Sequence, residues 1–186
     1  MPSATSRRGP TGDANAVPSV LITGSATGIG LATAVETARR GWTTIASMRD
    51  PARGDRLRAA AAEAGAAEHL VVEALDVTDA HSIAAALPRV LARTGGRLDA
   101  VVHNAGIAAA GAFEDLPEAE LRRVMETNFF GVLALTRALL PTLRAQRSGR
   151  IVVVSSNSAY AGEPANSFED AAARVKAALE AGKGKG

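Results

Sequence analysis

Five short apolar runs, separated by segments of helical periodicity, constrain the fold of this chain more than any other feature. The runs lie at residues 19–23, 42–48, 69–75, 98–103 and 150–155, and helices are predicted over 29–40, 51–64, 79–94 and 118–146. Strands that are connected through helices pair in parallel by right-handed crossovers. The pattern therefore predicts a doubly wound parallel sheet of about five strands, with helices on both faces in a three-layer α/β/α arrangement.

Residues with special backbone preferences mark the ends of the predicted helices. Gly41 is expected to end the first helix in the left-handed conformation. Asp50 and Asp79 are expected to cap the helices that follow them. Pro117 is expected to open the long helix, and Pro141 to kink its final turns.

The 186 residues fit a single folded domain with two tails. Residues 1–18 are rich in Pro, Gly and Ser without any periodicity, which predicts a disordered N-terminal tail. Residues 19–167 carry all five apolar runs and form the predicted domain. Residues 168–186 are predicted to form one further helix, over 169–181, followed by a Gly/Lys tail.

Composition excludes several classes of function. The sequence contains no cysteine, so a disulfide framework and a thiolate metal site are excluded, no metal is expected, and a cytoplasmic location is the default. No apolar run is long enough to span a bilayer, and Arg7-Arg8 lacks the apolar stretch that follows an export signal. The net charge is only +2, the arginines are dispersed and aromatic residues are few, so nucleic acid is not an expected partner.

A glycine-rich loop follows the first apolar run and leads directly into the first helix. Gly24 allows the chain to turn sharply off the strand, while Gly28 and Gly30 leave room for a pyrophosphate and for close packing of helix on sheet. The helix N-terminus would direct free N–H groups and the positive end of its dipole at the anion. Any tight turn can use glycine, so a structural interpretation stays open, whereas the absence of Gly-Lys-Ser/Thr argues against a nucleoside triphosphatase. The candidate loop residues are Gly24, Ser25, Thr27, Gly28, Ile29 and Gly30.

The spacing of this loop and of four later motifs is similar to that of the short-chain dehydrogenase/reductase family, classical type. The motifs are Asp76-Val77, Asn104-Ala105-Gly106, Asn128 and Ser155-Ser156, in the family's order along the chain. The similarity extends over about residues 19–167. It implies a Rossmann-type fold, an NAD(P)-binding domain, and oxidoreductase chemistry on a small-molecule carbonyl or secondary alcohol.

By this resemblance, residues after the third and fourth apolar runs contact the coenzyme. Asp76 would accept a hydrogen bond from the adenine amino group and the Val77 N–H would bind the ring, with a helix-capping carboxylate as the alternative interpretation of Asp76. Asn104-Ala105-Gly106 would run beneath the nicotinamide ribose, with a simple turn as the alternative. His103 is expected to pack locally.

The end of the second apolar run distinguishes the two coenzymes. An acidic residue there binds the ribose 2′-hydroxyl of NAD(H), whereas an arginine accommodates the 2′-phosphate of NADP(H). The chain has Arg49 at this point, followed by Asp50, which is expected to cap the next helix. NADP(H) is therefore favoured over NAD(H), with a solvated surface arginine as the alternative interpretation of Arg49.

The family's catalytic set of Asn, Ser, Tyr and Lys is matched only in part. Asn128 and Ser156 match the first two members. The tyrosine and lysine are expected thirteen and seventeen residues after Ser156, where this chain has Glu169 and Ala173. No Tyr-x-x-x-Lys occurs anywhere, since the tyrosines and lysines of the sequence are Tyr160, Lys176, Lys183 and Lys185.

Three hypotheses follow from the resemblance. The chain is an NADP(H)-dependent oxidoreductase, or a coenzyme-binding remnant without turnover, or an interaction module that forms a homo-oligomer through the helix 118–146. The two further strands that the family normally carries are not predicted, and an internal deletion after Ser167 would explain their absence. The segments around Arg49 and Ser156 look like those of the branch that acts on steroids, retinoids and similar lipophilic carbonyls.

Overall fold

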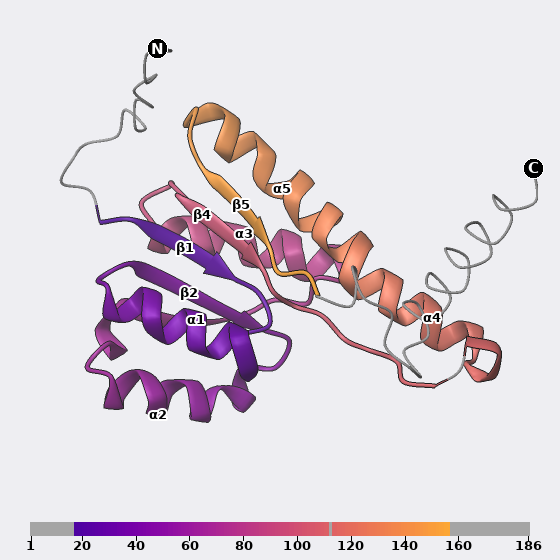
Figure 1. Cartoon of the computed structure of the whole chain (residues 1–186). Coiled ribbons are helices and arrows are strands. Elements are labelled where there is room, and N and C mark those ends of the chain that lie inside the picture. Colours follow the sequence, from indigo (N-terminus) through magenta and orange to yellow (C-terminus); the bar gives the residue numbers. More distant parts are fainter. Residues whose placement is uncertain (1–16, 112, 157–186) are drawn as a thin grey trace, which may run out of the picture.

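The computed structural model describes residues 17–111 and 113–156. Within them, five parallel strands form one sheet in the order β3-β2-β1-β4-β5 (Figure 1). The strands are β1 Ser19–Ile22, β2 Thr43–Met48, β3 Leu70–Ala74, β4 Ala100–His103 and β5 Arg150–Val153. The doubly wound parallel sheet predicted from the sequence is therefore confirmed.

Helices cover both faces of this sheet. The α-helices are α1 Gly28–Arg39, α2 Asp55–Glu63, α3 Ala80–Arg93, α4 Glu118–Met125 and α5 Gly131–Ala145. Short 3-10 turns occur at η1 Pro51–Gly54, η2 Ala67–His69 and η3 Phe113–Asp115, and a π-helical turn, η4 Glu126–Phe130, joins α4 to α5.

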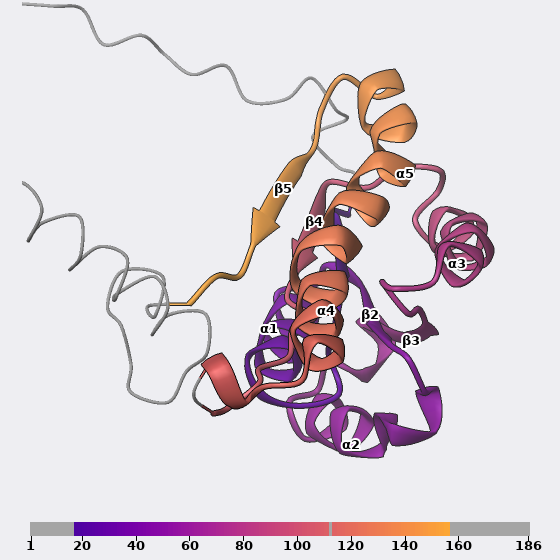
Figure 2. The same ribbon diagram turned by 90° about the vertical axis from the view of Figure 1, so that its right-hand side faces the viewer.

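Two apolar clusters hold the layers together. On one face, Leu21, Ile45 and Val101 of the sheet pack against residues of α3 and α5 such as Leu135 and Leu139. On the other face, Val20, Ile22 and Ala46 pack against Ala34 of α1 and Leu57 of α2. Adjacent residues of one strand belong to different clusters because successive side chains point to opposite faces of the sheet. In Figure 2, α3 and α5 lie on the same side of β4.

Most of the predicted element boundaries hold to within two residues, and the caps hold as well. Gly41 has a φ of 80° after α1. The side chain of Asp50 accepts a hydrogen bond from the Ala52 N–H, and that of Asp79 accepts one from the His81 N–H. The chain continues as α5 through Pro141 to Ala145.

Two predicted helices are not single α-helices. The segment 51–64 begins as the 3-10 turn η1 before it becomes α2, because the Asp50 cap and Pro51 tighten its first turn. The segment 118–146 is interrupted by the π-helical turn η4, where one extra residue is accommodated per turn. This turn contains Asn128.

The strand β5 lies at the margin of the sheet in the part of the chain that the structure describes (Figure 2). Its apolar residues and the one after it, Ile151 to Val154, are each between 37% and 52% exposed. These four neighbouring residues therefore form an exposed apolar surface along β5. The predicted C-terminal helix, the Gly/Lys tail, and all of the predicted N-terminal tail except residues 17 and 18 lie outside the described residues.

No helix within 17–111 and 113–156 combines the length and apolar character needed to cross a membrane. The same described residues hold no group of three or more His, Asp or Glu side chains arranged to bind a metal ion.

Candidate functional site

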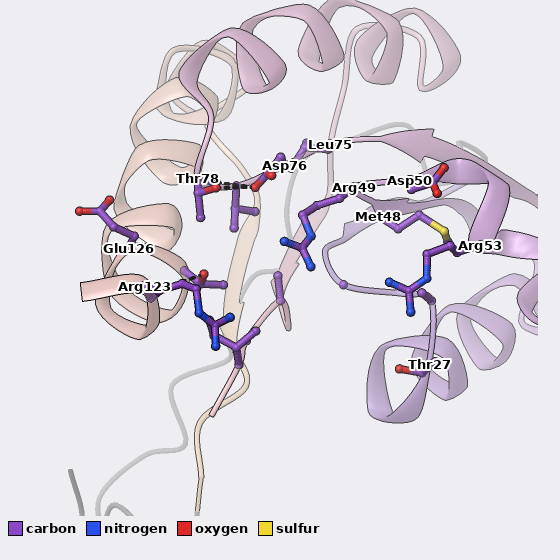
Figure 3. A pocket seen from close by; sticks show the side chains of 17 residues that line it. Thr27, Met48, Arg49, Asp50, Arg53, Leu75, Asp76, Thr78, Arg123 and Glu126 are labelled. Atoms are coloured by element: carbon purple, nitrogen blue, oxygen red, sulfur yellow. Dashed lines mark hydrogen bonds between the residues drawn. The ribbon is translucent and has the colours of Figure 1, made fainter. Parts of the chain in front are cut away.

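A cleft of about 940 Å³ opens where the carboxyl ends of four strands meet the starts of the helices that follow them (Figure 3). The doubly wound fold places ligands at this edge of a parallel sheet. The lining residues come from the loop after β1, the ends of β2 and β3, the turn η1, the loop after β4, and α4 with η4. They are Gly24, Ala26, Thr27, Met48, Arg49, Asp50, Arg53, Leu75, Asp76, Val77, Thr78, Ala105, Gly106, Ile107, Arg123, Glu126 and Thr127.

Gly24 makes the turn from β1 into the loop, as the sequence predicted. Its φ is 69°, in the left-handed region that favours glycine. A Cβ atom at this position would lie 2.7 Å from the Cα of Ala105, a backbone atom of the loop after β4. The two loops that floor the cleft are therefore in direct contact, and only a residue without a side chain fits between them.

Gly30 provides the close helix packing that the sequence predicted. A Cβ at Gly30 would collide with Nδ2 of Asn104 and with the carbonyl oxygen of Gly24. Asn104 uses the same Nδ2 to donate hydrogen bonds to the carbonyl oxygens of Thr23 and Gly24, each at 3.0 Å. The Asn104 side chain therefore holds the glycine-rich loop in place from behind, and it is not among the residues that line the cleft.

The N-terminus of α1 faces this loop without a side-chain cap. Its capping residue, Thr27, is extended and forms no capping hydrogen bond, and no acidic residue occupies the first turn. The first N–H groups of a helix have no partner within the helix, and they carry the positive end of its dipole. The end of α1 beside the cleft is therefore suited to bind an anion such as a pyrophosphate.

Not every predicted loop residue reaches the cleft. The Ser25 hydroxyl is fully buried and donates to the Ile22 carbonyl oxygen at 2.9 Å, while the Ser25 N–H donates to that of Ser47 at 3.0 Å. Gly28 has a φ of 59° and open space around it, and Ile29 is 65% exposed; neither lines the cleft. Gly24 and Thr27 are thus the predicted loop residues that line it.

The end of β2 brings two guanidinium groups into the cleft. Arg49, directly after β2, and Arg53, in η1, both line it, and in Figure 3 both side chains point toward the loop that carries Thr27. Asp50, which lies between them in sequence, accepts the Ala52 N–H at 3.0 Å and caps η1. Asp50, the acidic residue nearest to Arg49 in sequence, therefore serves as the N-cap of η1.

Asp76 and Val77 lie just after the end of β3, the strand that pairs with β2. The Oδ1 atom of Asp76 accepts hydrogen bonds from the N–H and the hydroxyl of Thr78, at 2.9 and 2.7 Å. Asp79, and not Asp76, caps α3. Oδ2 of Asp76 forms no hydrogen bond within the described chain, so one oxygen of this cleft-lining carboxylate can accept a ligand donor.

Thr23 is a structural residue of the site that belongs to none of the sequence motifs named above. Its Oγ1 accepts the backbone N–H groups of Asn104 and Ala105, each at 3.0 Å. The hydroxyl of Thr23, just after β1, thus fixes the position of the loop that follows β4. Arg53 and Arg123 also belong to none of these motifs, although Arg53 follows Arg49 by only four residues. Arg123 is engaged by Glu120, with a shortest N–O distance of 2.7 Å.

Asn128 lies in the π-helical turn and clamps the loop after β4. Its Oδ1 accepts the Ile107 N–H at 2.9 Å, and its Nδ2 donates to the Ile107 carbonyl oxygen at 2.8 Å. The amide side chain therefore reproduces the pairing of a β-strand and holds Gly106 and Ile107 beside the cleft. Ser156, the other predicted catalytic residue, lies two residues beyond Val154 and is exposed.

His103 ends β4 and is buried, as expected for a residue that packs locally. Its Nε2 lies 3.0 Å from Oγ1 of Thr136 in α5, while its buried Nδ1 forms no hydrogen bond within the described residues. Burial disfavours the charged imidazolium, so the pKa of His103 is lowered from its ordinary value. Burial therefore favours the neutral imidazole over the imidazolium in the folded chain.

Comparison with proteins of known sequence identifies relatives over most of the chain. A family profile described as short chain dehydrogenase matches residues 18–177. Retinol dehydrogenase 8 from Homo sapiens is 39% identical over 164 residues, which cover 87% of this chain and 50% of that protein. 17-beta-hydroxysteroid dehydrogenase type 1 from Homo sapiens is 38% identical over 168 residues, covering 87% and 48%. The chain thus spans about half the length of these curated relatives.

Solved structures of the same kind superimpose on it. A short-chain dehydrogenase from Streptomyces avermitilis is 39% identical with a TM-score of 0.69, covering 77% of this chain and 50% of that one. The F189W variant of actinorhodin polyketide ketoreductase, whose structure contains NADPH, is 27% identical with a TM-score of 0.76, covering 83% and 59%. Together with the cleft and its glycine-rich loop, these matches show that the chain belongs to the short-chain dehydrogenase family and carries its nucleotide-binding Rossmann fold.

Proposed function

We propose that this chain binds NADP(H) in the cleft, with the pyrophosphate at the N-terminus of α1 and the adenosine between the ends of β2 and β3. The observation that carries this proposal is the uncapped start of α1 beside Gly24 and Thr27. Asp76 and Val77 would hold the adenine, and Ala105 and Gly106 would lie beneath the nicotinamide ribose. Asn104, Gly28 and Gly30 would support these contacts by shaping the loop.

The preference for NADP(H) over NAD(H) rests on the charges at the end of β2. Arg49 has neither a hydrogen bond nor an ion pair with any described residue, whereas the Asp50 carboxylate is engaged as a cap. A free guanidinium group binds a phosphate through two parallel hydrogen bonds. An acidic residue that could accept the 2′-hydroxyl of NAD(H) is missing from this position.

A titration with the two reduced coenzymes tests the proposal. NADPH is expected to bind more tightly than NADH. Arg49→Ala should lower the affinity for NADPH about 10- to 100-fold, which is the usual effect of losing hydrogen bonds to a charged group. Arg144→Ala is the matched control, because Arg144 is exposed on α5 and does not line the cleft. Equal affinity for both coenzymes would contradict the preference, and binding of neither would contradict the proposed site.

The reaction proposed for the domain is the reduction of a carbonyl to a secondary alcohol, or the reverse oxidation. The names of the relatives suggest retinoids and steroids as substrates to test first. In such a reaction Ser156 would orient the carbonyl, and Asn128 would act on the site through the Ile107 backbone that it holds. The proposal includes a cytoplasmic location, which the absence of cysteine favours.

A second candidate function is coenzyme binding without turnover. It is favoured by Glu169 and Ala173, at the positions where the resemblance expects tyrosine and lysine. A glutamate with an ordinary pKa near 4.3 is ionised at neutral pH and has no proton to donate. Loss of a positioned general acid lowers the rate about 10²–10⁴-fold.

The two candidates differ in whether NADPH is consumed. Under the second, the wild-type chain binds NADPH without oxidising it in the presence of retinal, a steroid ketone or simple ketones. Glu169→Tyr combined with Ala173→Lys should then raise consumption, and Glu169→Phe with Ala173→Lys is the control that lacks only the phenol proton. Steady consumption by the wild-type chain would exclude the second candidate.

A third candidate, self-association through the helix 118–146, is favoured by exposed apolar side chains along it. Met125, Phe129, Phe130 and Leu133 are between 36% and 50% exposed, and the two phenylalanine rings stack edge to face with centroids 5.2 Å apart. Large aromatic side chains are typical of association surfaces. Light scattering should show a dimer that Phe130→Asp converts to a monomer; a monomeric wild-type chain would exclude this candidate.

A further inference from the structure

Arg53 is held in a defined position four residues after Arg49. The turn η1 begins at Pro51, whose ring restricts the backbone, and the carboxylate of Asp50 caps it through the Ala52 N–H. The Arg53 N–H donates to the Asp50 carbonyl oxygen at 3.1 Å. Because the backbone of Arg53 is fixed in this way, its side chain starts from a constant point on the cleft wall.

The Arg53 guanidinium is not neutralised by its surroundings. Within 17–111 and 113–156 it forms neither a hydrogen bond nor an ion pair, and the same holds for Arg49. By contrast, Arg58 on the next turn pairs with Asp55 at 3.1 Å, and Arg123 across the cleft pairs with Glu120 at 2.7 Å. The end of β2 is thus the part of the cleft wall where two uncompensated positive charges lie together.

Among the described residues, no acidic side chain that lines the cleft forms an ion pair with Arg49 or Arg53. Asp50 caps η1, and Figure 3 shows its carboxylate pointing away from the guanidinium group of Arg49. Asp76 follows β3, the strand that pairs with β2, and its Oδ1 atom accepts the N–H and the hydroxyl of Thr78. In Figure 3 the Glu126 carboxylate points outward from α4 and η4. Two guanidinium groups that share a wall repel each other until an anion lies between them.

A phosphate monoester has the right chemistry to fill this position. It carries a charge between −1.5 and −2 at neutral pH and presents three terminal oxygens, which can accept hydrogen bonds from two guanidinium groups at once. A pyrophosphate oxygen carries less charge and is expected at the start of α1. A ribose 2′-hydroxyl carries none, so it gains nothing from a second cation.

We infer that Arg53 is a second determinant of coenzyme specificity, which binds the ribose 2′-phosphate together with Arg49. The inference rests on the proposed binding of NADP(H) in this cleft. Arg49 approaches from the end of β2 and Arg53 from η1, so the two side chains bind different oxygens of one phosphate. Discrimination between NADPH and NADH is then shared by two residues.

Coenzyme titrations of the full chain test this assignment. Arg53→Ala should lower the affinity for NADPH and for the fragment 2′,5′-ADP about 10- to 100-fold, while leaving the affinity for NADH unchanged. Arg56→Ala is the matched control: Arg56 lies three residues further on, is exposed, and does not line the cleft. It removes the same net charge and should leave the ratio of NADPH to NADH affinity unchanged. Unfolding curves that coincide with wild type establish that each variant is folded.

A double-mutant cycle with Arg49→Ala separates a shared phosphate from two independent sites. If both residues bind one phosphate, the effects of the single variants on 2′,5′-ADP affinity are not additive. Additive effects, an equal loss of NADPH and NADH affinity in Arg53→Ala, or an equal loss in Arg56→Ala would each overturn the assignment.

The same data distinguish failure of this inference from failure of the proposed function. A wild-type chain that binds neither coenzyme contradicts the proposed function itself. A wild-type chain that prefers NADPH, loses this preference in Arg49→Ala and keeps it in Arg53→Ala refutes only the role of Arg53.

Discussion

Substitution of Gly24 by alanine tests the physical basis of the site most directly. Two separate effects act at this position. The backbone is in the left-handed region, with a φ of 69°, and a Cβ would lie 2.7 Å from the Cα of Ala105. The steric contact with Ala105 lies between the loop after β1 and the loop after β4. A side chain at Gly24 would therefore disturb the floor of the cleft.

Gly41 separates the two effects. Its φ is 80°, similar to that of Gly24, but no atom lies within 4 Å of the position that a Cβ would occupy. Gly41→Ala should therefore lower the free energy of unfolding by about 1–2 kcal/mol, the cost of the left-handed conformation alone. Gly24→Ala adds the displacement of the Ala105 backbone, for which overpacking typically costs about 1–3 kcal/mol more. The expected total for Gly24→Ala is about 2–5 kcal/mol.

Denaturant unfolding followed by far-ultraviolet circular dichroism measures these free energies. Fluorescence titration with NADPH then measures the effect on the cleft under conditions where both variants are folded. Gly24→Ala should lose most of its NADPH affinity, because Ala105 and Gly106 move with the displaced loop. Gly41→Ala should retain it, because Gly41 lies at the other end of α1.

An equal loss of stability in the two variants would refute this reasoning. It would mean that the loop after β4 yields to the new methyl group without cost, so that the contact between Gly24 and Ala105 places no constraint on the site. Retention of NADPH affinity by Gly24→Ala, despite the expected loss of stability, would show that the coenzyme does not depend on this floor.

Three further substitutions probe the contacts that shape the site. Thr23→Val keeps the shape of the side chain but removes the acceptor of two N–H groups, and should lower the free energy of unfolding by about 1–3 kcal/mol in denaturant unfolding; an unchanged value would exclude this role. Asn128→Ala removes both hydrogen bonds to Ile107, and should weaken NADPH binding more than Asn128→Asp, which keeps the acceptor for the Ile107 N–H. His103→Asn should reduce the dependence of stability on pH. Because burial lowers the pKa of His103, its neutral form stabilises the fold fully above the unfolded-state value of about 6.5, and this contribution is lost as the pH falls from there through the lowered pKa. Unfolding midpoints measured between neutral and acidic pH should therefore change less in the variant, and equal slopes would contradict the burial effect.

Much of the fold could be predicted because its determinants are local. Three kinds of feature depend only on residues that are close in sequence: the apolar runs, the glycine that ends α1, and the Asp50 and Asp79 caps. Their patterns can therefore be recognised without a structure. The π-helical turn η4 was not predicted. It contains Asn128, whose hydrogen-bond partner is the backbone of Ile107, 21 residues earlier, and a local sequence pattern does not reveal such a partner.

The sequence by itself determined that the chain forms a parallel α/β sheet with a glycine-rich loop opening its first helix, since periodicity and glycine spacing arise from neighbouring residues. Only the tertiary structure decided which side chains face the cleft. Asn104 and Ser25 turn inward to hold the loop, while Arg53, which carried no recognised motif, lies on the wall beside Arg49. The physical reason is that their partners belong to other strands and turns, so packing of the sheet and its helices sets the direction of each side chain.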